Sequence, residues 1–151
     1  MLTVTPFLWF ESQAEHAANF YASIFPRAKV LSVSRMQGRV MTAELEIEGQ
    51  RVVALNGNTQ FKFNDSFSFQ VGCETQDEID RLWAELTADG GEPGRCGWLK
   101  DRFGVSWQVI PDSLPRFLSG GGDPARSQRV MGVFFQMSKI DVDSLQRAFD
   151  G

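Results

Sequence analysis

The sequence predicts an α+β fold made of two successive modules and a C-terminal helical arm. Three observations carry this prediction. Short segments rich in β-branched and aromatic residues, typical of strands, are interleaved with two stretches of helical periodicity before residue 112. The second half of this region begins with the same order of strand and helix as the first half, which indicates an internal repeat. After Pro111 the strand patterns stop and capped helical segments follow.

The length of the chain sets the number of domains. A chain of 151 residues is long enough for one compact domain and too short for two full ones. We therefore assign residues 1–151 to a single domain. Module one is expected at 1–60, module two at 61–111 and the helical arm at 112–151.

Module one is predicted to contain one helix and four strands. A strand is expected over 3–10 and a helix over 14–25, where apolar residues recur at the 3.6-residue period and Pro26 ends the helix. Gln37-Gly38 and Glu48-Gly49 are typical of tight turns between strands. The three strands that these turns separate are expected at 29–36, 40–47 and 51–55.

Module two begins with the same order. A strand is predicted over 66–72 and a helix over 75–86, with Thr75 as its N-cap and Glu78 completing a capping box. Two more strands are expected at 94–99 and 105–110, separated by a turn at 101–104.

The arm is predicted to be helical. The segment 119–124 (SGGGDP) reads as a flexible hinge, and Asp123 with Pro124 is typical of a helix start. That helix is expected to run to about Met137, and a short last helix is expected over 141–149.

Composition narrows the class of protein. The net charge is −4 and the basic residues are scattered, which argues against nucleic-acid binding. No apolar run approaches the roughly 18 residues needed to span a bilayer, and the first residues carry no secretory signal, so we expect a cytoplasmic protein. Cys73 and Cys96 are then expected as free thiols. The single histidine, His16, excludes sites that need two or three imidazoles.

The aromatic residues are numerous and almost all lack a hydroxyl group: thirteen Phe and four Trp accompany one Tyr. Such rings suit a dry core or an apolar cavity. Strand alternation places Phe7 with Trp9, and Ala54 with Asn56, on what we expect to be the cavity face. We predict a cavity whose ligand-binding residues are aromatic rings and a few polar side chains. The rings are those of Phe7, Trp9, Phe63, Phe67 and Trp98, and the polar side chains are those of Asn56, Lys100 and Gln108.

Each of these residues also has a simpler interpretation, which the sequence leaves open. The rings fill a core, Asn56 begins a tight turn with Gly57, and Lys100 forms a solvent-exposed pair with Asp101. Cys96, expected on a strand, is interpreted as an inert thiol, because no basic group is evident nearby to lower its pKa.

Four segments carry a family resemblance: FLWFESQAEHAANFYASIFP at 7–26, ALNGN at 54–58, FKFN at 61–64 and CGWLKDRFGVSWQVIP at 96–111. With them the chain resembles the PhnB-like branch of the glyoxalase/bleomycin-resistance/dioxygenase superfamily, also called vicinal oxygen chelate proteins. Some members carry the label 3-demethylubiquinone-9 3-methyltransferase. The resemblance extends over nearly the whole chain, the arm included. It implies paired βαβββ modules that curl into a cup-shaped, mostly antiparallel sheet, usually in a dimer.

The resemblance also implies where a metal ion would be held. The metal-dependent members place four ligands on the first and last strand of each module, which correspond here to Thr5 (or Pro6), Ala54, Ser66 and Gln108. Thr, Ala and Ser do not supply the donors of a tight divalent site, so we expect no metal. The only glycine run, 120–122, follows no strand, so we expect no nucleotide-type cofactor and treat the methyltransferase label as a name.

Together these points predict a metal-independent small-molecule binding protein, with an apolar or aromatic ligand in a ring-lined cup and a homodimeric assembly. The alternative is an enzyme of the vicinal oxygen chelate type, a lyase, a dioxygenase or the methyltransferase of the label, with an atypical metal site. A third possibility is a structural or regulatory dimer without a ligand. The sequence leaves enzymatic activity open.

Overall fold

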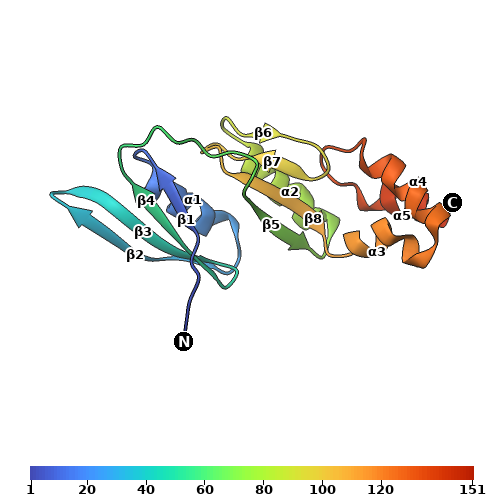
Figure 1. Ribbon diagram of the computed structural model, residues 1–151, viewed down its shortest axis with the longest axis horizontal. Helices are drawn as coiled ribbons and strands as arrows, with labels where there is room; N and C mark the ends of the chain where they lie inside the picture. Colours follow the sequence, from blue (N-terminus) through green and yellow to red (C-terminus); the bar gives the residue numbers. More distant parts are fainter. The chain divides into compact units, whose positions relative to one another are not determined.

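A computed structural model describes residues 1–151. The chain divides into two compact units, Met1–Lys62 and Phe63–Gly151, whose elements are labelled in Figure 1. No helix of the chain is both long enough and apolar enough to cross a membrane.

The first unit is a four-stranded sheet with one helix. Its strand order is β1-β4-β3-β2, with β1 parallel to β4 and the other pairs antiparallel. The elements are β1 (Phe7–Phe10), α1 (Ala14–Ile24), β2 (Ala28–Met36), β3 (Arg39–Ile47) and β4 (Gln50–Asn56). The predicted order is confirmed, but β1 starts at Phe7 and not at residue 3.

Both predicted hairpin turns are confirmed by their backbone. Gln37 and Gly38 have φ of 50° and 77°, and Glu48 and Gly49 have φ of 49° and 89°. Two successive residues with positive φ form the mirror-image turn whose twist matches that of antiparallel strands, and glycine adopts this conformation without strain. These turns fix the register in which β2, β3 and β4 pair.

Helix α1 covers one face of the first sheet and leaves the other face open. The burial of β1 alternates, with Leu8 and Phe10 buried and Phe7 and Trp9 exposed. The core between helix and sheet includes Leu8, Phe10, Ala17, Ala18, Tyr21, Ala43, Leu45 and Val52.

The second unit repeats this plan. Its strand order is β5-β8-β7-β6, with β5 parallel to β8. The elements are β5 (Ser68–Cys73), α2 (Gln76–Thr87), β6 (Glu92–Pro93), β7 (Trp98–Lys100) and β8 (Ser106–Pro111). The predicted repeat is therefore confirmed, and the second unit has the full βαβββ order. The capping box of α2 is also present: Glu78 N donates to Thr75 Oγ1 at 3.2 Å, and Thr75 N donates to Glu78 Oε2 at 3.3 Å.

The strand predicted at 94–99 is wrong. The structure has a hairpin there, β6 and β7, with a turn at 94–97 in which Cys96 (φ 57°) and Gly97 (φ 83°) are left-handed. Cys96 is therefore in a turn and not on a strand. The two glycines of the segment GRCG permit this turn, and alternation alone does not reveal it.

A buried carboxylate organises the turn between β7 and β8. Asp101 accepts hydrogen bonds from the backbone N–H of Phe103 (2.9 Å) and Val105 (3.1 Å) and from Trp107 Nε1 (2.9 Å). These bonds supply partners for a charge that would otherwise be costly to bury. The motif DRFGVSW is thus explained by the geometry of a turn, and the proposed solvent-exposed pairing of Asp101 with Lys100 is wrong.

The arm forms a small helical cluster in the second unit (Figure 1). Its elements are α3 (Leu114–Ser119), η1 (Gly120–Gly122), α4 (Pro124–Phe134) and α5 (Val142–Asp150). Asp123 and Asp141 cap α4 and α5 by accepting backbone N–H groups at 2.9 and 2.6 Å. The buried residues of the cluster are Leu114, Phe117, Val130, Phe134, Ile140, Leu145 and Phe149.

Candidate functional site

The open face of the second sheet carries a row of polar side chains. Trp107 and Val109 are buried with Val105, whereas Gln108 points to the opposite face, as the alternation of β8 predicts. Gln108 Nε2 donates to Ser68 Oγ at 2.9 Å, and Gln70 Nε2 donates to Gln108 Oε1 at 3.3 Å. The amide of Gln108 is thus held in one orientation by side chains of β5.

Asp65 connects the start of this unit to β7 and β8. Its Oδ1 accepts a hydrogen bond from Ser106 Oγ at 2.9 Å and lies 3.5 Å from Lys100 Nζ. Lys100 and Ser106 are register partners on neighbouring strands, so one carboxylate serves both. The ammonium of Lys100 therefore lies in a partly exposed ion pair with Asp65.

A cavity of about 380 Å³ opens beside Lys100. Trp98 contributes an aromatic residue to its lining, and two acidic and two basic residues also line the cavity. The lining residues are Asp65, Glu92, Pro93, Gly94, Arg95, Trp98, Leu99 and Lys100. All of them belong to the second unit, so the cavity is complete within that unit.

The structure brings only part of the predicted ligand-binding set together. Trp98 and Lys100 line the cavity, and Gln108 is the register partner of Trp98 on β8. Phe67 is exposed and packs edge-on against Phe69 with 5.4 Å between ring centroids, and neither Phe67 nor Phe63 lines the cavity.

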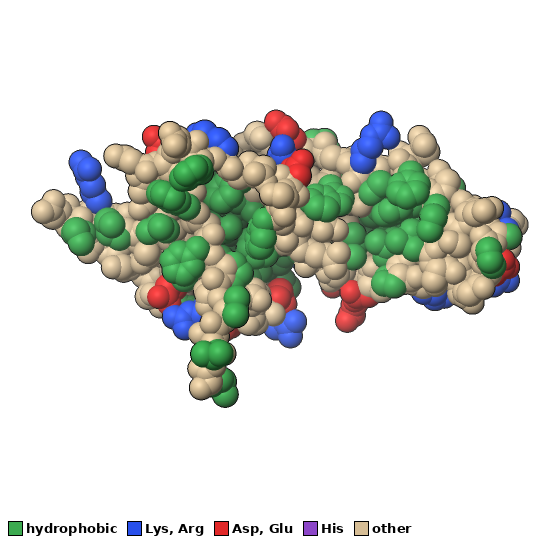
Figure 2. Space-filling model, in the orientation of Figure 1, with side chains coloured by type: hydrophobic (Ala, Val, Ile, Leu, Met, Phe, Trp, Pro, Cys, Tyr) green, Lys and Arg blue, Asp and Glu red, His purple; other side chains and the backbone are tan.

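Phe7 and Trp9 lie on the open face of the first unit. Their exposed fractions are 62% and 41%, and the Trp9 ring contacts Phe61 with 5.7 Å between centroids. A shallow hollow of about 450 Å³ next to Trp9 is lined by Trp9, Glu11, Asn58, Thr59, Gln60 and Phe61. Figure 2 shows hydrophobic side chains exposed on the viewed side of both units.

The predicted placement of Asn56 and Ala54 on the cavity face is wrong. In the parallel pairing of β1 with β4, Ala54 is opposite Leu8 and Asn56 is opposite Phe10, so both lie on the face that α1 covers. Ala54 is buried there, and Asn56 Oδ1 accepts the N–H of Ala14 at 2.8 Å at the start of α1. The prediction failed because it fixed the face of β4 without the register that links it to β1.

The four positions compared with metal ligands do not carry the donor atoms of a metal centre. Thr5 precedes β1, Ala54 is buried under α1, and Ser66 lies in the turn before β5. Gln108 alone has a donor atom on an open sheet face, and its amide oxygen already accepts from Gln70. No three His, Cys, Asp or Glu side chains are grouped so that they could hold a metal ion. These residues do not fit a divalent cation, which needs several carboxylate or imidazole donors.

Sequence reasoning missed Asp65, Glu92 and Arg95. All three are exposed residues of turns or of the two-residue strand β6, and strand alternation assigns no face to such positions. The glycines on either side of Arg95 and Cys96 were the one available signal, because two glycines so close together favour a tight turn.

Neither cysteine belongs to the cavity lining. Both are free thiols. Burial, with a smaller contribution from the nearby carboxylates of Glu78 and Asp112, raises the pKa of Cys73 to about 11, so this thiol is protonated at neutral pH. A protonated, buried thiol is a poor nucleophile.

Two consecutive βαβββ units, in each of which the first and last strands pair in parallel, define the glyoxalase/bleomycin-resistance class, the vicinal oxygen chelate fold. The family model for 3-demethylubiquinone-9 3-methyltransferase matches residues 2–110. The chain therefore belongs to this PhnB-like family. The match ends at residue 110, so the resemblance expected for the arm is not part of it.

Solved structures support the same assignment. The PhnB protein of Bacillus cereus, named as a candidate 3-demethylubiquinone-9 3-methyltransferase, is 33% identical with a TM-score of 0.68, over 73% of this chain and 99% of that chain. The fosfomycin resistance protein FosX of Mesorhizobium loti shares the fold at 11% identity, with a TM-score of 0.58 over 78% of this chain and 96% of that chain. Protein PA1353 of Pseudomonas aeruginosa shares the fold at 19% identity, with a TM-score of 0.58 over 74% of this chain and 100% of that chain. No curated protein matches the sequence.

Proposed function

We propose that the protein binds a small planar aromatic molecule, without a metal ion, in the cavity beside Trp98 and Lys100. The observation that supports this proposal is the cavity of about 380 Å³, which has the size of a small-molecule site and an indole ring in its wall. Aromatic rings favour stacked or edge-on contact with other rings, which selects a planar ligand.

The charges around the cavity indicate a ligand without a large net charge. Lys100 is paired with Asp65 at 3.5 Å, and Glu92 lies opposite Lys100 in the register of β6 and β7. Arg95 completes a balanced set of two cations and two anions. Such a lining attracts neither anions nor cations over long distances, and it offers hydrogen bonds to polar groups on the rim of a ring.

A fluorescence titration with Nile red, an uncharged planar aromatic dye, tests the proposal. We expect saturable binding to the wild type and a loss of affinity of about tenfold in Trp98→Ala, because the variant removes the ring that the dye contacts. Phe135→Ala, which removes an exposed ring outside the cavity lining, is the matched control and should change the affinity less than about twofold. Absence of saturable binding, or an equal loss in both variants, would refute the proposal.

The alternative of a metal-dependent enzyme makes a different prediction. It requires a stoichiometric transition metal in protein purified without an affinity tag, and loss of that metal in Gln108→Ala. Since the amide oxygen of Gln108 is engaged by Gln70, we expect no such metal in either protein.

We also propose that the protein is a cytoplasmic homodimer. Two free thiols fit a reducing compartment. Phe7, Trp9 and Phe61 expose large apolar surfaces on one unit, and such surfaces favour association. Sedimentation equilibrium should give twice the chain mass for the wild type and a shift toward monomer for Phe7→Ser. A wild type that stays monomeric at all concentrations would exclude the dimer.

A further inference from the structure

The segment 137–142 of the arm runs along the hairpin turn at 94–97. Cys96 N donates to Met137 O and Gly97 N donates to Ser138 O, both at 2.9 Å. Ser138 Oγ donates to Gly94 O at 2.5 Å. The arm thus supplies partners for three backbone groups of a turn that lies in another part of the sequence but in the same unit.

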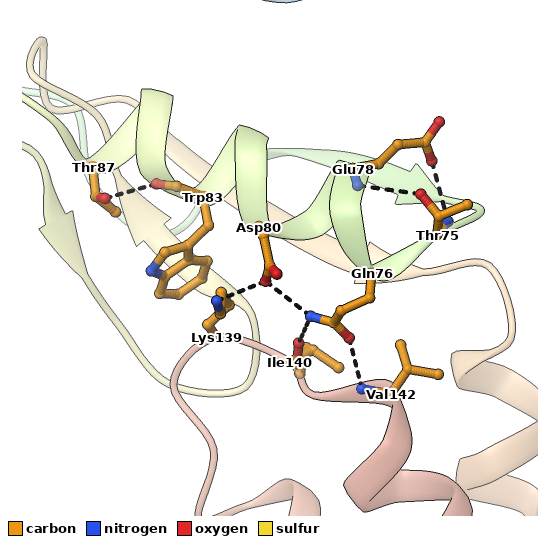
Figure 3. A network of polar contacts seen from close by, with 9 residues as sticks. All are labelled: Thr75, Gln76, Glu78, Asp80, Trp83, Thr87, Lys139, Ile140 and Val142. Carbon is orange, nitrogen blue, oxygen red and sulfur yellow. Dashed lines mark hydrogen bonds and ion pairs between the residues drawn. The ribbon is translucent and has the colours of Figure 1, made fainter.

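The same segment is attached to α2 by one glutamine and one ion pair. Gln76 Nε2 donates to Ile140 O and Gln76 Oε1 accepts from Val142 N, each at 2.9 Å. Lys139 Nζ lies 2.6 Å from Asp80 Oδ1. Figure 3 shows Gln76 and Asp80 on the first turns of α2, both pointing toward this segment. The side-chain hydrogen bonds from Lys139 and Gln76 lower the pKa of Asp80, so its charge persists in mild acid.

Packing makes the contact specific for a glycine. Ile140 is fully buried, and a Cβ atom on Gly97 would lie 2.7 Å from Val109 O and 3.2 Å from Ile140 Cγ1. Only glycine fits both this close approach and the positive φ of 83° at the position. The close packing of Gly97 against Ile140 therefore requires glycine in the turn.

The turn is also a wall of the cavity. Gly94 and Arg95 line it, and Trp98 N donates to Arg95 O at 3.0 Å, which connects the turn to the indole-bearing residue. Cys96 has the left-handed backbone that side chains disfavour, so hydrogen bonds from outside the turn help to stabilise this conformation. The arm provides them through the carbonyls of Met137 and Ser138.

We propose that residues 137–142 are a brace that holds the turn 94–97 in place and thereby sets the affinity of the cavity, with Gln76 and Ser138 as positioning residues. The link to affinity rests on the proposed function. The family match ends at residue 110, and 99% of the Bacillus cereus relative is covered by 73% of this chain. Residues 137–142 thus lie outside the part of the chain that the family model matches.

Two variants and a matched control test the brace in the full chain. Gln76→Ala removes two bonds from a side chain to the backbone of the segment, and Ser138→Ala removes the bond to Gly94 O. Arg129→Ala is the control, because Arg129 also donates two bonds to backbone oxygens, of Ala148 and Phe149, but inside the arm. The measurements are amide hydrogen exchange at Cys96 and Gly97, Nile red affinity, and the melting temperature.

We expect exchange at Cys96 and Gly97 to be about tenfold faster in Gln76→Ala and Ser138→Ala, with a loss of Nile red affinity of at least about threefold. Arg129→Ala should lower the melting temperature by a similar amount and change neither of the other measurements. A merely structural role of Gln76 and Ser138 would make all three variants alike.

Three outcomes overturn separate claims. Unchanged exchange at Cys96 and Gly97 in both variants would overturn the brace. Faster exchange with unchanged dye affinity would overturn its link to the cavity and leave the proposed function intact. A wild type that binds no dye would overturn the proposed function and the link together, and hydrogen exchange would then still decide whether the brace exists.

Discussion

Asn56 accepts the N–H of Ala14 at 2.8 Å and donates to Val40 O at 3.2 Å, so one side chain ties the end of β4 to α1 and to β3. The residue that precedes the helix, Gln13, makes no side-chain cap. Asn56 therefore satisfies a backbone donor at the helix start that nothing local satisfies. Its role is in the stability of the first unit.

Replacing Asn56 with alanine should lower the free energy of unfolding by about 1–3 kcal/mol, since a helix-start N–H and a strand carbonyl lose their partners. Asn56→Asp keeps the acceptor for Ala14 N and should lose less. Asn58→Ala, an exposed amide two residues away, should stay within about 0.5 kcal/mol of the wild type. Urea unfolding measures all three. A reduced Nile red affinity at unchanged stability in Asn56→Ala would show that the residue contacts ligand after all.

The second residue whose behaviour follows from its surroundings is Cys73, which is 2% exposed. Its pKa of about 11 stands above the ordinary value of 9.0, chiefly because burial disfavours the thiolate. Below pH 9 the thiol is protonated in both the folded and the unfolded state, and its contribution to stability is complete. As the pH rises from 9 to 11 the unfolded thiol ionises first, so this contribution is lost.

The free energy of unfolding should therefore decline between pH 9 and 11 by about 2 kcal/mol more in the wild type than in Cys73→Ala. Cys96→Ala, which keeps Cys73, should retain the wild-type slope. Chemical unfolding at a series of pH values gives the comparison. Equal slopes in wild type and Cys73→Ala would mean that the thiol ionises as readily in the folded protein as in the unfolded chain.

At the scale of the elements, the turn between β7 and β8 is organised by a single buried carboxylate. Asp101 accepts two backbone N–H groups and the indole N–H of Trp107, whose ring is buried. These contacts fix where β8 begins, and with it the face on which Gln108 lies. The sequence predicted a turn at 101–104, but it placed Asp101 in a solvent-exposed pair with Lys100, because the indole N–H that the carboxylate accepts comes from Trp107, six residues further along the chain.

Asp101→Ala should lower the free energy of unfolding by about 2–4 kcal/mol, because a buried indole N–H and two backbone donors lose their acceptor. Glu85→Ala removes an exposed carboxylate on α2 and should change stability by less than about 0.5 kcal/mol. Denaturant titrations of both variants make the test. A loss below 1 kcal/mol in Asp101→Ala would mean that water replaces the carboxylate as the acceptor.

Elements with a strong local signal were predicted well. The capping box of Thr75 and Glu78 and the glycine-containing turns of the first unit are written in adjacent residues, and each was confirmed. The β6–β7 hairpin and the face of Asn56 were missed because both depend on partners distant in the chain. The register of β1 with β4 is a tertiary property, and the turn at 94–97 receives hydrogen bonds from the distant arm, so a period of two supplies neither.

For the whole molecule, the repeated βαβββ order and the family were predicted from the sequence, whereas the lining of the cavity was predicted only in part. Trp98 and Lys100 line the cavity; Asp65, Glu92 and Arg95 lie in turns or at a strand edge and could be placed only by the structure. Whether the two units unfold together is a further property of the whole chain.

A single domain over residues 1–151 should unfold in one cooperative transition. Differential scanning calorimetry should then give equal calorimetric and van't Hoff enthalpies for the wild type. Asn56→Ala, which perturbs Met1–Lys62, should lower the midpoint of that one transition without splitting it. Two separate transitions, with only one of them moved by the substitution, would mean that the units fold independently.

Two hydrogen bonds between the brace and the hairpin join main-chain atoms only: the carbonyls of Met137 and Ser138 accept the N–H groups of Cys96 and Gly97. Every amino acid except proline offers both groups. The side chain of Met137 can therefore change in evolution while these two hydrogen bonds persist, whereas Gly97 is constrained by its packing against Ile140 and Ser138 by its hydroxyl bond to Gly94 O. Among homologues that keep the brace we expect no proline at positions 96, 97 and 142, because each of these residues donates its backbone N–H.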